Sequence, residues 1–435
     1  MRYITFAVYQ INSMKTIVCL FALMITGCSC NDSSGNGAPK PRPVVAKEDS
    51  LSYYPPTPAK LTQQQFRYYY REFAHYFDSA LLRKGFNGGI LIAKDGNIVY
   101  EQYAGYSNLR TKDPMTDSTM MHITSSGKTF TGTAVLRLAQ DNMLSLDDPM
   151  EKFFPGFPYP GVTVKMLLSH RSGLPNYLHF IPTNKWDRKT YLTNQEMLNQ
   201  LVTLKPRRLF APGTRFTYSN TNFVLLAMII EKVSGMSFAD YLRTHFFEPL
   251  GMKHTYVFKM DDSATATQSF QANGAQWQYD EFEGTYGDKN IYTTPEDLLK
   301  WDQAFYTEEI INKATQEMAF TPYSLEKPSI HNYGLAWRLL MLPNGKKVIY
   351  HNGRWHGFNA AFARLTDEKA TIIILGNKYN SRIYTTARRA YDIFGNYLQT
   401  KDGDQEESEA TDTVVKKVSH HKSSKHHSRK VKRKR

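Results

Sequence analysis

The 435-residue sequence predicts an α/β (α+β) fold, in which an antiparallel sheet is flanked by N- and C-terminal helices and interrupted by a large all-helical insertion. Three observations predict this fold. Strand-like segments joined by short turns occur early in the chain and again after about residue 332. Helical periodicity dominates between them, and an amphipathic helix lies outside each group. Because hairpin-linked strands pair antiparallel, we expect both groups to form one sheet, with the helical stretch inserted between its halves.

The first elements should be a helix and a hairpin. Aromatic residues and leucines recur at three- and four-residue steps over residues 62–84, which is typical of an amphipathic helix. Two predicted strands follow, Gly88–Ala93 and Asn97–Tyr103, and Lys94-Asp95-Gly96 should form the turn that joins them.

The middle of the chain is predicted to be mostly helical. Between Phe223 and Val233 apolar residues cover almost the whole helical circumference, which predicts a buried helix. The helices predicted in this stretch, separated by proline and glycine, are Thr124–Gln140, Val164–Ser169, Asn194–Thr203, Asn220–Ser234, Phe238–Phe246 and Pro295–Tyr306.

After about residue 332 the hydrophobic period becomes that of strands, with turns at Pro343-Asn344-Gly345 and Asp367-Glu368. A last helix is predicted over Ile383–Leu398. The predicted strands are Tyr333–Leu342, Lys347–Tyr350, Phe358–Leu365 and Thr371–Leu375.

These elements define one folded domain over residues 61–400. Its α/β lobe should consist of about 61–120 and 330–400, and its helical lobe of about 121–329. Hydrophobic residues make up 41% of the chain and aromatic residues 13%, which excludes disorder throughout. Residues 28–60 are rich in Ser, Gly and Pro and have no apolar period, so we predict a flexible linker there.

The net charge of +14 is concentrated at the C-terminal end. Residues 414–435 contain ten basic and no acidic residues, which leaves +4 for the rest of the chain. We predict that residues 401–435 form a disordered tail, first acidic and then basic. The tail should contact anionic envelope polymers or lipids rather than nucleic acid, because the chain is predicted to be exported. The paired histidines His420-His421 and His426-His427 could ligate a metal, but we interpret them as solvated and expect no metal or cofactor.

The N-terminal residues indicate export. Met14-Lys15 and the apolar run that follows read as a signal peptide over residues 1–27, with Met14 as the better start. The end of this run, Ile25-Thr26-Gly27-Cys28, resembles a bacterial lipobox, which predicts lipidation of Cys28. The alternative is an ordinary cleaved signal. All three cysteines lie within the first thirty residues, so thiol chemistry in the folded domain is excluded.

A candidate nucleophile lies at the start of the helix predicted over Thr124–Gln140. Ser125 and Lys128 are one helical turn apart, so the amine can reach the hydroxyl. A serine hydroxyl needs an adjacent base to attack carbonyls, and lysine serves if burial or nearby positive charge lowers its pKa. The alternative is that Ser125 only caps the helix.

A second candidate motif is Tyr218-Ser219-Asn220, directly before the buried helix. A tyrosine hydroxyl beside a lysine can pass a proton to a leaving group, and an asparagine amide can hold the lysine and a substrate carbonyl. The same tripeptide occurs at Tyr106-Ser107-Asn108, which we interpret as a turn because it precedes the candidate nucleophile. A turn is also the alternative for Tyr218.

The third motif, His351-Asn352-Gly353, lies at the end of a predicted strand. Glycine there lets a substrate approach the strand edge, and the amide of Arg354 could form an oxyanion hole with the amide of Ser125. The Arg354 guanidinium is a candidate partner for a substrate carboxylate. The alternative is a hairpin turn.

Taken in this order, the three motifs resemble those of the serine β-lactamase and penicillin-binding protein superfamily. Further phrases are similar to the branch of class C β-lactamases, DD-carboxypeptidases and related esterases. These are Leu146-Asp147-Asp148-Pro149, Leu167-Leu168-Ser169-His170-Arg171-Ser172-Gly173-Leu174-Pro175 and Phe247-Glu248-Pro249-Leu250-Gly251-Met252. The resemblance implies a β-lactamase/transpeptidase-like fold. It also implies that Ser125 is acylated and that Lys128 and Tyr218 share the acid-base catalysis. Asn220 would have a positioning role, and His351 would line the pocket.

Two departures from the family pattern bear on the substrate. Class C β-lactamases usually have lysine in place of His351, and Tyr286-Gly287-Asp288-Lys289-Asn290 replaces a glycine-rich phrase. Both argue against an efficient β-lactamase. A histidine with a pKa near 6.5 offers less fixed charge than lysine, so we expect activity on carboxylate-bearing substrates to weaken between about pH 6 and 8.

The predicted function is that of a serine hydrolase, lipid-anchored in a bacterial cell envelope, that acts on D-amino-acid peptides through an acyl-Ser125 intermediate. The alternatives are a carboxylesterase or weak β-lactamase of the same fold, with ester or β-lactam substrates. A non-catalytic protein that binds peptidoglycan peptides is the alternative of another class.

Overall fold

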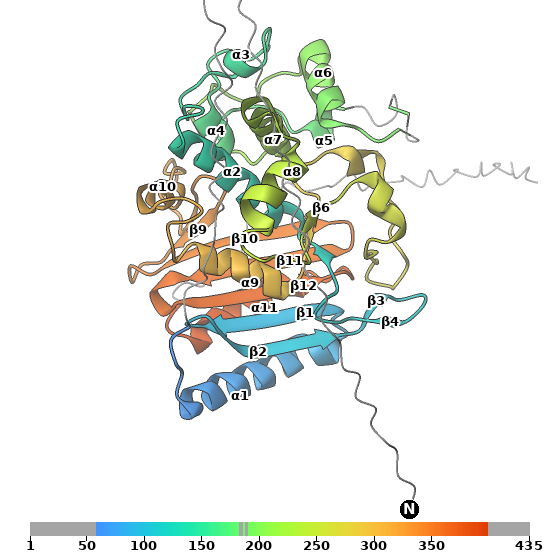
Figure 1. Ribbon diagram of the computed structural model, residues 1–435, viewed down its shortest axis with the longest axis vertical. Coiled ribbons are helices and arrows are strands. Elements are labelled where there is room, and N and C mark those ends of the chain that lie inside the picture. The colour runs from blue at the N-terminus through green and yellow to red at the C-terminus, as the bar shows by residue number, and fades with distance from the viewer. Residues whose placement is uncertain (1–57, 182–185, 188–189, 399–435) are drawn as a thin grey trace, which may run out of the picture. The chain divides into compact units, whose positions relative to one another are not determined.

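A seven-stranded antiparallel sheet organises the part of the chain that the computed structural model describes, residues 58–181, 186–187 and 190–398 (Figure 1). Its strand order is β2-β1-β12-β11-β10-β9-β8. The strands are β1 (Gly88–Lys94), β2 (Asn97–Ala104), β8 (His331–Tyr333), β9 (Arg338–Met341), β10 (Lys347–Trp355), β11 (Phe358–Leu365) and β12 (Ala370–Gly376). Strand β1 pairs with β12, with Ile90 opposite Ile374, so early and late segments share one sheet. The predicted α+β fold is confirmed.

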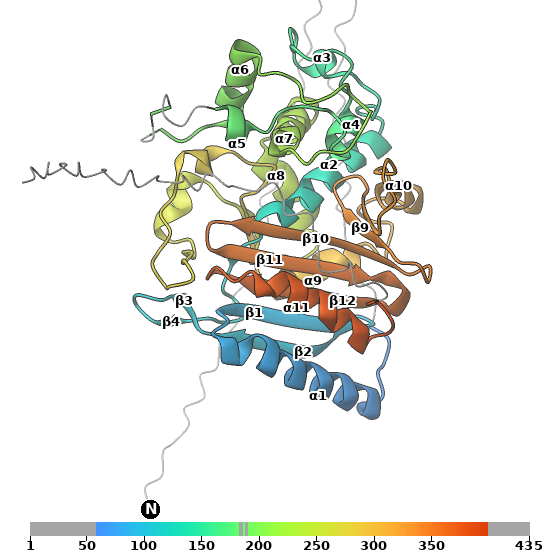
Figure 2. The same cartoon turned by 180° about the vertical axis from the view of Figure 1, so that it is seen from behind.

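Along the central strands, successive side chains alternate between the two faces of the sheet, and both faces are apolar. In β1, Ile90 and Ile92 belong to one buried cluster, whereas Leu91 and Ala93 belong to another. A strand directs successive side chains to opposite faces, so a continuous apolar run requires cover on both sides. Helix α9 lies in front of the sheet in Figure 1, and α11 lies in front of it in the reverse view of Figure 2.

Eleven α-helices lie in the described residues. They are α1 (Gln63–Ala80), α2 (Lys128–Gln140), α3 (Met150–Phe153), α4 (Val164–Leu168), α5 (Tyr177–Phe180), α6 (Asn194–Leu204), α7 (Asn220–Ser234), α8 (Phe238–Leu242), α9 (Pro295–Ala304), α10 (Lys313–Ala319) and α11 (Arg382–Ala390). Helix α1 begins with a capping box between Thr62 and Gln65, and α7 ends at Gly235 in the left-handed conformation. The bounds of α7 are those predicted from its apolar pattern.

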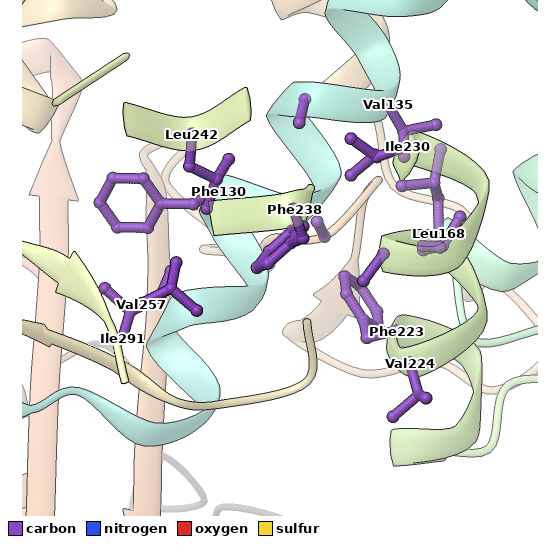
Figure 3. Packing of buried hydrophobic residues seen from close by; sticks show 14 of the residues in the cluster. Phe130, Val135, Leu168, Phe223, Val224, Ile230, Phe238, Leu242, Val257 and Ile291 are labelled. Atoms are coloured by element: carbon purple, nitrogen blue, oxygen red, sulfur yellow. The ribbon is translucent and has the colours of Figure 1, made fainter. Parts of the chain in front are cut away.

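Helices α2 and α7 form the centre of the insertion. Residues 223–230 of α7 are all buried, as the apolar circumference predicted. Figure 3 shows Val135 of α2 beside Ile230 of α7, with Phe130 and Phe223 in the same cluster. This packing places the starts of the two helices next to each other, and two of the candidate motifs span those helix starts.

The structure differs from the predicted elements at several places. The strand predicted over Tyr333–Leu342 is two strands, because residues 334–337 turn the chain back so that Tyr333 of β8 pairs with Arg338 of β9. The helix predicted to Leu398 ends earlier, at Ala390. Tyr106-Ser107-Asn108, predicted as a turn, is strand β3, which pairs with β4 (Asp113–Pro114).

A second small sheet lies within the stretch predicted to be helical. It consists of β5 (Met121–His122), β7 (Ile291–Thr293) and β6 (Tyr256–Val257), in that order. Strand β5 directly precedes the candidate nucleophile, so its pairing with β7 fixes where the motif begins.

Several predictions concern residues outside the described part of the chain. These are the signal peptide, Cys28, most of the linker, and the acidic and basic tail with its paired histidines. Among the described residues, no single helix has the length and hydropathy to cross a membrane. Asn220–Ser234 and Phe238–Phe247 pass that test together, as a pair bent by 78°.

Candidate active site

Ser125 lies in a 3₁₀ turn, Thr124–Gly127, that leads into α2. Thr124 has a φ of 56°, a left-handed conformation that is strained for a threonine. Ser126 fastens the turn to the sheet, because its Oγ donates a hydrogen bond of 2.8 Å to the carbonyl of His351 on β10. Ser125 itself is buried, with 7% of its surface exposed.

Lys128 is the first residue of α2 and is fully buried. Its Nζ donates to Ser125 Oγ at 3.1 Å, which is the contact that the spacing of the motif predicted. A second, shorter bond of 2.6 Å runs from Nζ to the backbone carbonyl of Asp288. The amine is therefore held against the hydroxyl by a carbonyl from the segment 286–290.

Tyr218 comes from the residues just before α7 and meets the same amine. Lys128 Nζ lies 5.0 Å from the centroid of the Tyr218 ring. The ring also packs on His170, at a centroid distance of 4.2 Å. His170 is buried with a φ of 55°, and its Nδ1 accepts a bond of 3.2 Å from the amide of Ser219. The imidazole of His170 therefore positions Tyr218 in two ways: it packs on the Tyr218 ring, and it holds the backbone of the next residue, Ser219.

Asn220 is the first residue of α7, after the N-cap Ser219. Its Oδ1 is buried and accepts no hydrogen bond from any described residue. A buried acceptor without a donor is costly, so this oxygen suits a donor brought by a substrate. The predicted positioning role of Asn220 stays a prediction.

His351 lies on β10 and is completely buried. Its Nδ1 lies 2.7 Å from the carbonyl of Asn352, and the Tyr333 hydroxyl lies 3.2 Å from its Nε2. These partners indicate the neutral tautomer with the proton on Nδ1. Burial, together with the positive charges of Arg338 and Lys128, holds the pKa of His351 well below its usual 6.5. The expected loss of a proton between pH 6 and 8 is therefore wrong.

Gly353 lies directly against the backbone of Ser125 and its neighbour Thr124. A Cβ added there would stand 1.9 Å from Thr124 Oγ1 and 2.7 Å from the amide nitrogen of Ser125. Only glycine permits this approach, which brings the edge of β10 to the Ser125 amide. An oxyanion hole formed by the amides of Ser125 and Arg354 stays a prediction.

The Arg354 side chain is directed elsewhere. Successive side chains of β10 alternate, and Trp355 belongs to the cluster on the helical face of the sheet. The Arg354 guanidinium lies 5.9 Å above the ring of Tyr379, which follows β12. We therefore assign the guanidinium no carboxylate role, and the predicted role of its amide is unaffected.

Arg338 on β9 is the guanidinium beside the site, and none of the three sequence motifs contains it. It lies 5.2 Å from the centroid of the Tyr218 ring, so that Arg338 and Lys128 both approach the same phenol. Arg338 is opposite Tyr350, the residue before His351, so the pairing of β9 with β10 brings the backbone of Arg338 next to the third motif. The sequence would indicate Arg338 as a site residue only if the pairing register of β9 and β10 were already known.

The segment that replaces the glycine-rich phrase contains a buried ion pair. Asp288 and Lys289 are 1% and 3% exposed, and their charged atoms are 3.6 Å apart. Tyr177 on α5 donates to Asp288 Oδ2 at 3.0 Å and accepts from Lys289 at 2.8 Å. This network holds the backbone at Asp288, whose carbonyl binds Lys128.

One described cluster has the residue types of a metal site. Ligand atoms of Asp280, Glu283 and His356 lie within 4.8 Å of one another. Glu283 also accepts a bond of 2.9 Å from the indole of Trp355, and His356 lies 2.7 Å from the same oxygen. Burial and the charge of Glu283 raise the pKa of Asp280 to about 6. The cluster is satisfied as an ion-pair network at the β10–β11 turn.

Comparisons with known proteins bear on the family and the fold of this chain. A family model described as Beta-lactamase matches residues 73–394. Penicillin-binding protein 4* of Bacillus subtilis (strain 168) is 34% identical over 319 residues, which cover 69% of this chain and 70% of that protein. Protein flp of Staphylococcus aureus (strain MW2) is 28% identical, over 68% of this chain and 61% of flp. The structure of the octameric penicillin-binding protein homologue from Pyrococcus abyssi has a TM-score of 0.65 at 27% identity, covering 76% of this chain and 78% of that chain.

Proposed function

Because the chain belongs to the Beta-lactamase family, within the superfamily of serine β-lactamases and penicillin-binding proteins, we propose that it is a serine hydrolase that forms an acyl-Ser125 intermediate. The observation that supports this most directly is the 3.1 Å bond between Lys128 Nζ and Ser125 Oγ, with the Tyr218 ring 5.0 Å from the same amine. The proposed reaction needs a nucleophile, a base and a second proton carrier, and these three side chains would supply them.

The proposed reaction has two halves. Ser125 Oγ attacks the carbonyl carbon of an amide, and its proton passes to Lys128 Nζ. As the C–N bond breaks, the leaving amine takes a proton from the Tyr218 hydroxyl, and Lys128 returns its proton to Tyr218. Water then attacks the acyl ester, the acid is released, and a proton returns to Ser125 Oγ. The backbone amides of Ser125 and Arg354 would stabilise the oxyanion in both halves.

D-Amino-acid peptides that end in a free carboxylate are the proposed substrates, as for a DD-carboxypeptidase. Neutral His351 supplies no positive charge, but Arg338 supplies a permanent one 5.2 Å from the Tyr218 ring. A guanidinium next to the group that protonates the leaving amine is well placed for the carboxylate of that same leaving residue. In this proposal the substrate carboxylate is bound by Arg338 on β9 and not by the His351-Asn352-Gly353 motif on β10.

We place the enzyme in a bacterial cell envelope, held by a lipid on Cys28. The relatives named as penicillin-binding proteins and the resemblance of residues 25–28 to a lipobox support this proposal. Labelling of cells with radioactive palmitate would test it, because label on the wild type that is lost in Cys28→Ser is the expected result.

The function is tested by labelling purified protein with a fluorescent penicillin and by measuring D-alanine released from an acyl-D-Ala-D-Ala peptide. We expect a covalent adduct and D-alanine release, both abolished in Ser125→Ala. Hydrolysis of p-nitrophenyl acetate or nitrocefin without D-alanine release would identify an esterase or β-lactamase instead. A folded protein that forms no adduct and turns over nothing would be a binding protein.

A further inference from the structure

A cavity of about 560 Å³ borders the candidate active site on the Tyr218 side. Residues that line it include Thr217, which precedes Tyr218, and Tyr333, whose hydroxyl lies 3.2 Å from His351 Nε2. Arg338 lines it as well and lies 5.2 Å from the Tyr218 ring centroid. These residues place the cavity beside Tyr218 and His351, although Ser125, Lys128, Tyr218, Asn220 and His351 are not among its described lining residues.

Its position identifies which part of a substrate it would receive. In the proposed reaction Tyr218 gives a proton to the leaving amine, so the space next to Tyr218 belongs to the leaving group. The acyl group lies on the other side of Ser125, along the β10 edge at Gly353, where the strand contacts the Ser125 amide. The cavity is thus a leaving-group subsite in this orientation.

The charges around the cavity are predominantly positive. Arg215, Lys327 and Arg338 line it, together with His331. Glu326 is the carboxylate among its described lining residues, and Arg171 pairs with it. Arg215 and Lys327 are exposed and Arg338 is half-buried, so the positive charge extends from the site outward to the surface.

The size of the cavity exceeds what one alanine needs. Its volume falls within the roughly 300–1,000 Å³ of sites that hold drug-sized ligands. A single carboxylate held at Arg338 would leave Arg215 and Lys327 without a substrate group to bind. A larger leaving residue with a second acidic group would use both the space and the additional cations.

We propose that Arg215, Lys327 and Arg338 form a cationic subsite for a leaving group that carries a second carboxylate, such as an acidic D-amino acid. The inference rests on the proposed hydrolase function, because that function defines the leaving-group side. The chemistry is unchanged, since the scissile amide still yields one acid and one amine. The second carboxylate only adds binding energy at the cations.

Three peptides with one acyl donor and different last residues test the subsite: D-alanine, D-glutamate and its neutral isostere D-glutamine. We expect kcat/KM for the D-glutamate peptide to exceed that for the D-glutamine peptide about fivefold to tenfold at low salt, which is about 1–1.4 kcal/mol. The preference should shrink in 0.5 M salt. The ratio of the two kcat/KM values should fall to near one in the double variant Arg215→Gln/Lys327→Gln. Lys253→Gln, which alters an exposed lysine outside the cavity, should keep it.

Binding of the same peptides to Ser125→Ala, measured by calorimetry, separates failure of the subsite from failure of the function. Tighter binding of the D-glutamate peptide, lost in Arg215→Gln/Lys327→Gln on the same background, upholds the subsite even if the active protein cleaves none of the peptides. Equal binding of the D-glutamate and D-glutamine peptides, or a preference that survives the double substitution, overturns it.

Discussion

The Tyr333 hydroxyl and His351 Nε2 lie 3.2 Å apart in a completely buried contact at the base of the candidate site. Tyr333 belongs to the short edge strand β8, and His351 to the third predicted motif. With Nδ1 directed at the Asn352 carbonyl, both nitrogens of the imidazole are used while it is neutral. A second proton, on Nε2, would lie beside the Tyr333 hydroxyl and near two cations. We therefore expect His351 to stay neutral and to offer no positive charge to a substrate.

Buried neutral histidines predict that the protein loses stability in acid. Burial lowers the pKa of His122 to about 4, and holds the pKa values of His170 and His351 well below 6.5. The unfolded chain takes up these protons below about pH 6.5 and the folded chain does not, so the free energy of unfolding falls as the pH falls. Each histidine should contribute about 1.4 kcal/mol per pH unit between the unfolded and folded pKa values.

Urea unfolding at pH 7.5, 6.0 and 5.0 checks this dependence. His351→Asn should reduce the slope below pH 6.5 by about 1.4 kcal/mol per unit, whatever its effect on stability at pH 7.5. His75→Asn is the control, because His75 is exposed on α1 and should leave the slope unchanged. An unaltered slope in His351→Asn would show that His351 is protonated alike in both states.

Replacement of Arg338 should impair recognition of a substrate carboxylate. Arg338→Gln removes the guanidinium 5.2 Å from the Tyr218 ring, and a lost charge-assisted hydrogen bond costs about 1.5–3 kcal/mol. We expect KM for an acyl-D-Ala-D-Ala peptide to rise roughly tenfold to a hundredfold, with a much smaller change for the corresponding amide of the last residue. Arg354→Gln is the matched control and should change KM less than threefold, since its guanidinium lies over Tyr379. Equal effects of the two substitutions would contradict the assignment.

Local spacing was sufficient to predict the contact between the Ser125 hydroxyl and the Lys128 amine. Ser125 and Lys128 are one turn apart in sequence, so their contact depends on a single helix start. The bounds of α7 were likewise predictable, because one uninterrupted apolar segment ends at a glycine. Both predictions rest on interactions within a few residues.

Features that depend on pairing between distant segments were not predictable. Arg338 reaches Tyr218 only because β9 pairs with β10, and the strand prediction had merged β8 and β9 into one. The neutrality of His351 follows from burial by Tyr333 and other distant residues, which a reference pKa does not include. The sheet β5-β7-β6 has strands of two or three residues, too short for a hydrophobic period.

Gly353 should be intolerant of even one added carbon. In Gly353→Ala the new Cβ would lie 1.9 Å from Thr124 Oγ1 and 2.7 Å from the Ser125 nitrogen, so the turn holding the nucleophile must move. We expect the rate of acylation by a fluorescent penicillin to fall at least about a hundredfold, as misplacement by an ångström can do. Gly127→Ala is the control, because Gly127 has a φ of −60° and its nearest contact would be 3.4 Å. Near-normal acylation by folded Gly353→Ala would refute the close approach.

The ion pair of Asp288 and Lys289 should be costly to break on one side only. Lys289→Met leaves the Asp288 carboxylate buried with the Tyr177 hydroxyl as its donor, and an uncompensated buried charge costs about 3–5 kcal/mol. The double variant Asp288→Asn/Lys289→Met removes that charge and should recover most of the loss. A urea double-mutant cycle measures the coupling. Because the Asp288 carbonyl holds Lys128 at 2.6 Å, Lys289→Met should also slow acylation, and the double variant should restore part of the rate. Additive effects of the two substitutions would mean that the pair is not coupled and that another contact holds the segment 286–290.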